Sequence, residues 1–427
     1  MAESGLLSLW LALSARVAPL ARWHLQRRLA RGKEDPARLR EKMGEASLPR
    51  PPGTLVWIHA VGVGEVLALP ALVEALRARR PGLSVLITSS SRTSAAALAP
   101  NLPQGAFHQF LPLDAEAFVA RFLDHWRPDL SVWAERDVWP VMIEAVRERG
   151  IPLALINARM NAASFRAKGR ARRLYPVLYS RFAFVSAQDE DTARHFRALG
   201  VDPARLNVTG TLKAGAAPLA DQPQARVRLE GLLQGRRCWI AASTHPGDEA
   251  GVIAAQKDML RHDPATILVI APRDPARAAE VAGAARAAGL DTEIVAPGNR
   301  IGRAASVLVL SEIGQLGLWY RLADAAFVGG SFATTGGHNP YEPARLDCAV
   351  LHGPNVANFA GDYAAFHAAD AARMVEDGAA LATALRDPAL AETRGRAAIV
   401  AARGRQAVEA EAERLLSLLP GPLNPGG

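Results

Sequence analysis

The chain alternates short apolar runs with longer amphipathic runs from residue 54 onward, and this alternation limits the folds open to it. A first series of apolar runs, each expected to be a strand, covers 54–60, 83–88, 107–111, 129–134, 151–157 and 182–186. A second series covers 238–243, 266–271, 291–295, 306–311, 324–329 and 349–353. Helical patterns such as the one over 64–80 separate these runs. Strands that alternate with helices predict β-α-β units on parallel sheets.

The stretch between the two series, residues 211–223, is rich in Ala, Gly and Pro and has no clear period, so we expect a linker there. The chain is therefore expected to be an α/β protein with two doubly wound, Rossmann-like domains that face each other across a cleft, a natural place for a ligand. The expected boundaries are 1–50 for an N-terminal apolar and basic segment, 51–215 for the first domain and 222–427 for the second. The second domain would end in a helix from Ala391 to Leu419.

Cysteine usage excludes two further classes of protein. The chain has two cysteines, Cys238 and Cys348, which lie far apart and inside apolar segments. A disulfide scaffold or a structural zinc site is therefore not expected, and a reducing compartment is the simplest interpretation.

The N-terminal residues indicate contact with a membrane surface. Residues 5–15 are uncharged and largely apolar, but a spanning helix needs about 20 such residues, and an extension toward Leu20 would have to accommodate Arg16. Positive charges follow the apolar run, and Trp10 and Trp23 flank it as interfacial aromatics often do. This arrangement suits an anionic leaflet at the cytoplasmic side. The alternative is a first core helix with a solvated basic continuation.

The first motif that could carry chemistry is WIHAVGVGEV, residues 57–66. Gly62 and Gly64 permit a tight strand-to-helix turn, and Glu65 falls in the first helical turn, where the helix dipole favours a carboxylate. Such a group suits a general base at the mouth of a cleft. The alternative is a glycine turn whose acid only complements the dipole. The motif lacks the third glycine of the dinucleotide fingerprint, since Leu67 stands there.

The second motif is VGGSFATTGGHNPYEPA, residues 328–344. Two glycine pairs follow an expected strand, and Asn339, Pro340 and Glu342 have the residue types of an N-cap, a first helical position and a capping-box acid. Glycine-rich backbone that leads into a helix is a prepared anion site. A well-capped helix alone would not explain the four glycines and His338.

Two other groups follow expected strand ends, Ser243 to His245 and Ala271 to Arg273. An arginine in such a place is a natural phosphate partner, although a surface arginine is the alternative. Asp189 to Asp191 form an acid-x-acid pattern that some sugar transferases use for a metal ion. They look more like the acidic start of a helix, so we expect no metal site.

Residues 159–181 carry seven basic side chains and no acid. Such a run is usually a solvated face. Interleaved aromatic and apolar residues such as Phe165 and Tyr175 also suit a nucleic-acid surface, and an anionic lipid headgroup would be served equally well.

Taken together, these segments resemble the Kdo transferases, the 3-deoxy-D-manno-octulosonic acid transferases of lipid A biosynthesis, which have the two-Rossmann glycosyltransferase-B fold. The resemblance is carried by the basic N-terminal stretch and by WIHAVGVGEV (57–66), AERDVWPVMI (134–143), IPLALINARM (151–160), NVTGTLK (207–213), AASTHPGDE (241–249), IAPRDPAR (270–277) and VGGSFATTGGHNPYEPA (328–344). Each piece is weak alone, but the ordered set is specific and covers most of the chain.

The resemblance implies a role for particular residues. The family's catalytic base falls on Glu65, and the residues that assist the transfer fall on Glu135 and Lys213. The family's contacts with cytidine monophosphate (CMP) fall on Pro272, Arg273, Gly314, Gln315, Leu316, Asn339, Pro340, Tyr341 and Glu342. The chain departs from the family's pattern at Gly62, Thr211 and Gln315, where the family usually has Ser, Asn and Glu.

The implied activity is inverting transfer of Kdo from CMP-Kdo to a lipid A precursor, lipid IVA, at the cytoplasmic face of the inner membrane. The implied partners are CMP-Kdo, the lipid acceptor and an anionic membrane surface, with no cofactor, no metal ion and no nucleic acid. Two alternatives remain open: a transferase of the same fold that uses another nucleotide sugar, and a non-catalytic membrane-associated protein that binds nucleotide or nucleic acid.

Overall fold

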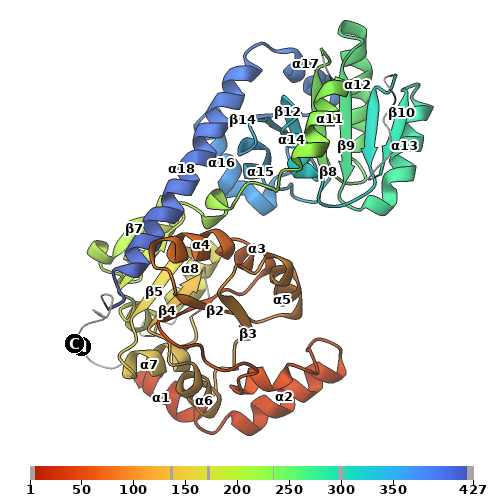
Figure 1. Ribbon diagram of the computed structural model, residues 1–427. Helices are drawn as coiled ribbons and strands as arrows, with labels where there is room; N and C mark the ends of the chain where they lie inside the picture. The colour runs from red at the N-terminus through yellow and green to blue at the C-terminus, as the bar shows by residue number, and fades with distance from the viewer. Residues whose placement is uncertain are drawn as a thin grey trace. The chain divides into compact units, whose positions relative to one another are not determined.

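A computed structural model describes residues 5–134, 138–170, 174–233, 235–296, 302 and 304–420. The chain forms two compact units, one made of Met1–Ala216 together with Gly404–Gly427, the other of Ala217–Arg403. Each unit contains one seven-stranded parallel sheet with helices on both faces (Figure 1). The predicted α/β class with two Rossmann-like sheets is therefore confirmed.

The first unit begins with two helices that precede its sheet, α1 (Gly5–Ser14) and α2 (Ala18–Ala30), and a short turn η1 (Leu39–Met43). Its strands are β1 (Leu55–His59), β2 (Ser84–Ser89), β3 (Ala106–Phe110), β4 (Leu130–Ala134), β5 (Leu153–Ala158), β6 (Phe184–Ala187) and β7 (Leu206–Val208), in the order β3-β2-β1-β4-β5-β6-β7. Its other helices are α3 (Val63–Val66), α4 (Leu69–Arg79), α5 (Arg92–Leu98), η2 (Ala99–Asn101), α6 (Glu116–Trp126), α7 (Pro140–Glu148), α8 (Ala162–Arg170), α9 (Tyr175–Tyr179), α10 (Glu190–Ala198), η3 (Pro203–Arg205) and η4 (Leu212–Gly215).

The strands of the second unit are β8 (Cys238–Thr244), β9 (Ile267–Pro272), β10 (Thr292–Val295), β11 (Val307–Leu310), β12 (Ala325–Val328), β13 (Ala349–His352) and β14 (Ala372–Met374), in the order β10-β11-β9-β8-β12-β13-β14. Its helices are α11 (Pro223–Leu233), α12 (Glu249–His262), η5 (Pro275–Arg277), α13 (Ala278–Ala287), α14 (Leu316–Tyr320), α15 (Tyr341–Ala344), η6 (Ala357–Phe359), α16 (Ala360–Ala368) and α17 (Gly378–Arg386). The last helix, α18 (Leu390–Leu416), runs from the second unit into the first.

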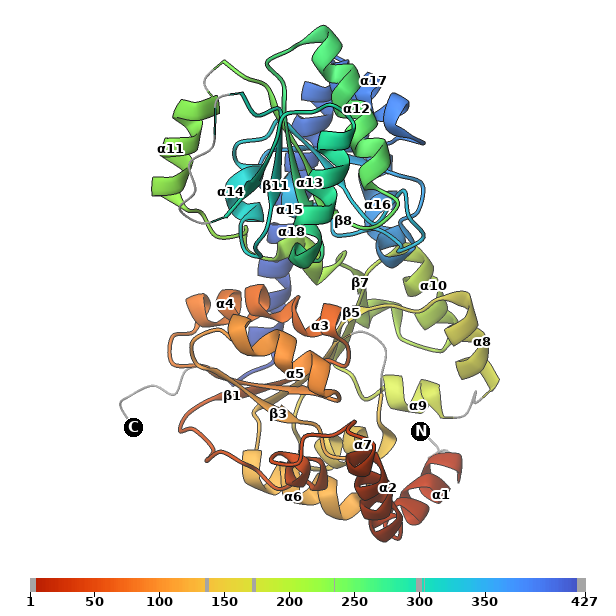
Figure 2. The ribbon, with the colours of Figure 1, turned by 90° about the vertical axis from the view of Figure 1, so that its right-hand side faces the viewer.

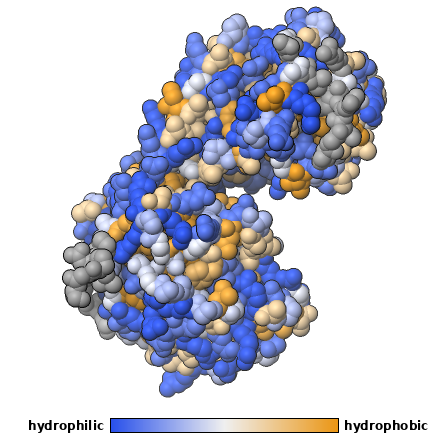
Figure 3. All heavy atoms as spheres, in the orientation of Figure 1, coloured by the Kyte–Doolittle hydropathy of each residue, from blue (hydrophilic) through white to orange (hydrophobic). Residues whose placement is uncertain are grey.

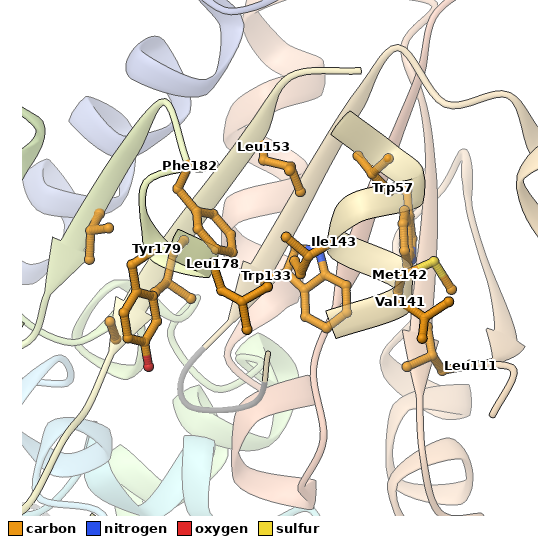
Figure 4. Packing of buried hydrophobic residues seen from close by; sticks show 14 of the residues in the cluster. Trp57, Leu111, Trp133, Val141, Met142, Ile143, Leu153, Leu178, Tyr179 and Phe182 are labelled. Carbon is orange, nitrogen blue, oxygen red and sulfur yellow. The ribbon is translucent and has the colours of Figure 1, made fainter. Parts of the chain in front are cut away.

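Strands β1 to β6 of the first sheet supply residues to two cores, because successive side chains point to opposite faces. On β1, Trp57 belongs to the core on one face, whereas Val56 and Ile58 belong to the core on the other. The first core contains an edge-to-face pair of Trp57 and Trp133, with ring centroids 5.7 Å apart, beside residues of α7 (Figure 4). Helices α6 and α7 cover that face, and α3, α4 and α5 lie on the opposite face (Figure 2).

All twelve expected strands are present, but the pattern missed β7 and β14. Both are three-residue strands at sheet edges, and a strand with a single neighbour and little burial needs no apolar run. The helix expected over 64–80 is broken into α3 and α4 around Leu67 and Ala68.

The segment expected as a linker contains η4, whose Leu212 is buried in the first unit. Helix α18 crosses this turn at very close range. A Cβ at Gly215 would overlap the side chain of Val408, and a Cβ at Gly404 would overlap Ala214. From Gly404 onward the helix therefore groups with the first unit, although we expected it in the 222–427 domain.

The N-terminal helices are attached to the first unit through part of their surface. Leu7 is buried in the core beside α7, while Trp10 and Leu13 on the same helix are exposed. In the part of the chain that the structure describes, no helix is both long and apolar enough to cross a membrane.

The crossing of α18 and η4 generates a stability prediction. Gly404→Ala should lower the free energy of unfolding by about 1–3 kcal/mol, the usual cost of an added methyl group in a close-packed site. Gly395→Ala is the matched control, because a Cβ there meets nothing within 4 Å and alanine favours the helix. Chemical denaturation of both variants measures the difference. Equal stabilities would show that the helix can shift away from η4 without cost.

Candidate active site

The candidate residues gather where each sheet has its topological switch point. In the first sheet this point lies between β1 and β4, and in the second between β8 and β12. Open parallel sheets bind ligands at the carboxyl ends of strands beside such a point. Glu65 follows β1, and residues 245–248 and 329–342 follow β8 and β12. Glu135, which comes directly after β4, lies outside the described residues.

Glu65 is held in place by the backbone of its own turn. Its Oε2 accepts hydrogen bonds from the Val61 N–H, at 3.1 Å, and from the Gly62 N–H. The side chain is half-buried, whereas Val63 and Gly64 beside it are exposed. Glu65 thus caps the start of α3, and the cap fixes its carboxylate at an accessible turn.

Lys213 lies against the same turn. A Cβ placed on Gly64 would be 3.7 Å from Lys213 Cε and 3.8 Å from its Nζ. The backbone of η4 that carries Lys213 is fixed from two sides: Thr211 Oγ1 accepts from the Lys213 N–H at 3.2 Å, and Asn157 Oδ1 accepts from the Leu212 N–H at 3.0 Å. The fold therefore places Lys213 against the turn that carries Glu65, although the two residues are far apart in the sequence.

His59 is a residue of this region that the sequence analysis did not single out. It is fully buried at the end of β1, and its Nδ1 lies 3.0 Å from Thr88 Oγ1 and 3.1 Å from the Thr88 carbonyl oxygen. Its ring packs edge-on against Trp133, and its Nε2 has no hydrogen-bond partner among the described residues. Burial lowers the pKa of His59 to about 4, so the ring is neutral at physiological pH. The signal in the sequence was a polar ring at the last position of a buried strand.

Asp248 organises the switch point of the second unit, and it too was missed. The carboxylate is fully buried and accepts four backbone N–H bonds, from His245 at 2.8 Å, Gly330 at 2.6 Å, Phe332 at 3.0 Å and Ala333 at 3.3 Å. One side chain therefore ties the turn after β8 to the glycine-rich loop after β12. In the sequence, Asp248 is an acid just before α12 and looks like an ordinary helix cap, so nothing there indicated its bonds to the distant loop.

The predicted phosphate partner lies in the same part of the second unit. The Arg273 backbone N–H donates to the Thr244 carbonyl oxygen at 2.9 Å, while its side chain is exposed. Burial raises the pKa of Glu342, and the positive charges of Arg345 and Arg273 act in the opposite direction. Burial lowers the pKa of His338, and the positive charge of Arg273 lowers it further. The fold therefore places Arg273 close to both Glu342 and His338.

The helix start expected at Asn339 is displaced by one residue. Helix α15 begins at Tyr341, so Pro340 stands at the cap and not at the first helical position. Asn339 still caps from one position earlier, since its Oδ1 accepts from the Tyr341 N–H at 3.0 Å. Its side chain also hydrogen-bonds to Glu342.

The expected contacts Gly314, Gln315 and Leu316 follow β11, on the same carboxyl edge as the end of β9, where Pro272 lies. Gly314 has a φ of +90°, which favours glycine. Gln315 Oε1 accepts weakly from the Trp319 indole N–H at 3.4 Å, which turns this side chain toward its own helix.

The acid-x-acid pattern has a structural role. Asp189 is the N-cap of α10 and accepts from the Thr192 N–H at 2.6 Å, and Asp191 pairs with Arg194. The predicted helix start at these residues is confirmed.

Comparison with solved structures identifies the fold. A UDP-GlcNAc 2-epimerase of Neisseria meningitidis, solved with bound UDP-GlcNAc, matches 86% of this chain and 99% of its own with a TM-score of 0.54 and 10% identity. At that identity the match concerns the fold alone, which is the two-sheet fold of glycosyltransferase-B proteins.

Sequence comparison defines the family. The family described as 3-deoxy-D-manno-octulosonic-acid transferase matches residues 37–216. The transferase of Bordetella pertussis is 35% identical, over 80% of this chain and 78% of its own, and that of Haemophilus influenzae is 31% identical over 74% of each. The chain belongs to the Kdo transferase family and is a glycosyltransferase.

Asp248 generates a prediction for the second unit. Asp248→Asn would turn an NH₂ group toward backbone N–H donors, which leaves buried donors unpaired and should cost about 1–3 kcal/mol of folding free energy. The variant should therefore melt earlier than the native protein in a thermal scan. Asp274→Asn is the control, because Asp274 caps Ala276 at an exposed turn and asparagine caps equally well. Equal losses in both variants would contradict the role of Asp248.

Proposed function

We propose that the chain transfers Kdo from CMP-Kdo to a lipid A precursor, lipid IVA, with inversion at the anomeric carbon and without a metal ion. Membership of the Kdo transferase family supports the donor and the reaction. The observation that carries the proposal is the turn after β1, where the Glu65 carboxylate is fixed by two backbone N–H groups beside Lys213.

Glu65 is proposed to act as the general base. It would take the proton of an acceptor hydroxyl as that oxygen attacks the anomeric carbon in line, on the face opposite to the leaving phosphate. Lys213, and Glu135 from outside the described residues, would assist the transfer. Fixing the carboxylate in advance means that no ordering cost is left for the reaction step.

The leaving group is CMP, whose phosphate gains negative charge as the bond breaks. Arg273 and the glycine-rich loop that Asp248 organises offer a positive side chain and oriented backbone where that phosphate would bind. Pro272, Gly314 to Leu316 and Asn339 to Glu342 are proposed to hold the nucleotide. These groups supply the charge that a divalent cation provides in other transferases, so the proposal needs no metal.

The acceptor is an anionic lipid, and the first unit has surfaces that suit it. On α8 and just before it lie the basic Arg159, Arg166 and Lys168, which follow the carboxyl end of β5. Hydrophilic residues predominate on the face shown in Figure 3, where apolar residues are scattered. Against such a surface, the exposure of Leu9, Trp10, Leu13, Leu20 and Trp23 on α1 and α2 is unusual. We propose that these helices lie on the cytoplasmic face of the inner membrane.

The basic stretch after α1 contributes less charge to this surface than its composition suggests. Lys42 is buried and pairs with Glu34 at 2.5 Å, and Arg38 pairs with Glu41 at 2.8 Å. These pairs neutralise both cations within the segment, and Lys42 and Arg38 also donate to the carbonyl oxygens of Ser90 and His108, at 2.8 Å and 2.9 Å. The charges available to lipid are therefore those of α2 and the loop after it, such as Arg22 and Arg31.

The function is tested by incubating the purified protein with CMP-Kdo and lipid IVA in excess chelator. We expect CMP release together with a lipid product heavier by Kdo in mass spectrometry. No transfer with CMP-Kdo but transfer with another nucleotide sugar would favour the first alternative, and nucleotide binding without any transfer would favour the second. Activity that chelator abolishes and magnesium restores would overturn the metal-free mechanism.

Glu65→Gln should keep the fold and CMP binding but reduce turnover by about 10²–10⁴-fold, the usual value of general-base help. The glutamine oxygen can still accept from the Val61 and Gly62 N–H groups, so the cap survives while the basicity is lost. Glu65→Ala, which removes the cap as well, should lose both turnover and about 1 kcal/mol of stability. Turnover by the Gln variant close to that of the native enzyme would remove Glu65 from the mechanism.

The double change Trp10→Ser and Leu13→Ser should weaken sedimentation with anionic vesicles roughly tenfold or more, because it removes two apolar side chains from the membrane surface. Binding of the variant should also be more sensitive to salt, since charge becomes its main attachment. Val227→Ser with Ile399→Ser is the matched control, as both side chains are exposed in the second unit. Equal binding by the two double variants would place the membrane contact elsewhere, with residues 159–181 the first candidate.

A further inference from the structure

Two histidines meet at the switch point of the second unit. The rings of His245, after β8, and His338, in the loop after β12, are nearly parallel, with an interplanar angle of 10°. Their Nε2 atoms are 2.9 Å apart. Two ring nitrogens at this distance need one proton between them, so one ring donates and the other accepts. The two rings therefore share a single hydrogen bond between their facing nitrogens.

Hydrogen bonds hold the backbone that carries each ring. The backbone N–H of His245 donates to Asp248, and the carbonyl of His338 accepts from the Tyr363 hydroxyl at 3.1 Å. Gly330 has a φ of +68°, and a Cβ there would lie 3.3 Å from the His338 ring and 3.4 Å from the His245 ring. The loop thus leaves room for the two rings and for no side chain between them.

Burial and nearby charge keep the His338 ring neutral in the free protein. Burial lowers the pKa of His338 to about 4, and the positive side chain of Arg273 acts in the same direction. Asp248 opposes this shift, but its carboxylate is already bonded to four backbone N–H groups. Glu342 lies near Arg273 as well. A second positive charge beside Arg273 is therefore unfavourable until an anion arrives.

We propose that the His245–His338 pair takes up a proton when the phosphate monoester of CMP binds beside Arg273. The added positive charge stabilises the doubly charged phosphate of the product more than the singly charged phosphate of the donor. This inference rests on the proposed function, since it takes CMP as the leaving group. In CMP-Kdo the phosphate is a diester with one negative charge, whereas in CMP it is a monoester that carries two at neutral pH. The second charge offsets the repulsion from Arg273, and the pair becomes easier to protonate.

The consequence for the reaction depends on when this charge appears. It develops as the bond between phosphate and sugar breaks, so a proton on the pair is held more tightly in the transition state than in the donor complex. Only interactions that strengthen in this way accelerate a chemical step. The two histidines are thus positioning residues for the leaving phosphate, and Glu65 remains the proposed base on the acceptor side.

The test is calorimetric titration of CMP into the protein in buffers of different ionisation enthalpy, which counts the protons taken up on binding. His338→Gln keeps a hydrogen-bonding group near the Nε2 position but cannot gain a charge. His367→Gln is the matched control, because His367 forms a similar Nε2–Nε2 contact of 3.0 Å with His352 on another strand end. CMP's own phosphate titration is common to all three proteins and cancels in the comparison.

Between about pH 5.5 and about pH 6.5, we expect the native protein and His367→Gln to take up more protons per CMP than His338→Gln, with the difference vanishing toward about pH 8. CMP affinity should fall with rising pH more steeply in the native protein, up to about tenfold per pH unit for one full proton. Cytidine, which has no phosphate, should show no difference, and a methyl ester of CMP, with one negative charge, a smaller one.

Equal proton uptake by the native protein and His338→Gln would overturn the inference while leaving the proposed function intact. Failure of the native protein to bind CMP at all would overturn both. If His338→Gln does not fold, the titration of ring resonances in the labelled native protein decides. Histidine resonances that titrate at higher pH with CMP than without it support the inference, and unchanged midpoints overturn it.

Discussion

Parallel strands have one consequence on which the rest of this structure depends: all their carboxyl ends meet at one edge of the sheet. A parallel sheet must also be covered on both faces, so its strands are apolar throughout and polar chemistry is confined to the loops and helix starts at the strand ends. In the first unit this edge brings Glu65 after β1 next to Lys213, which the chain reaches only after β7. In the second unit the same constraint joins residues after β8 and β12 through Asp248.

Carboxylates at these edges hold much of the local backbone in place. Glu65 accepts from the turn at the start of α3, Asp248 from two loops, and Asp114 from the Val141 and Met142 N–H groups at the start of α7. Burial raises the pKa of Asp114 to about 6, while its two backbone donors favour the charged form. The turns at the strand ends are thereby held by charge-assisted hydrogen bonds from backbone N–H groups to carboxylates, and not by the packing of apolar side chains.

The sequence predicted the features that depend on local pattern and missed those that depend on distant pairing. The buried strands were found because their apolar runs are continuous, whereas the edge strands β7 and β14 carry no such signal. Glu65 could be singled out from its glycine turn. Asp248 and His59 could not, because their importance comes from hydrogen bonds to residues tens of positions away, such as Gly330 and Thr88.

Helix α18 also has a consequence for the order in which the protein is made. Its last turns complete a core of the first unit, where Val408, Ala412 and Leu415 pack with residues of β1 and α4. A ribosome adds about 5–20 residues per second, so the whole second unit is translated before these side chains exist. Until then the nascent first unit exposes the apolar surface that α18 will cover. The first unit, although synthesised first, must be finished last, and a chain that stops early leaves that unit open to chaperones and proteases.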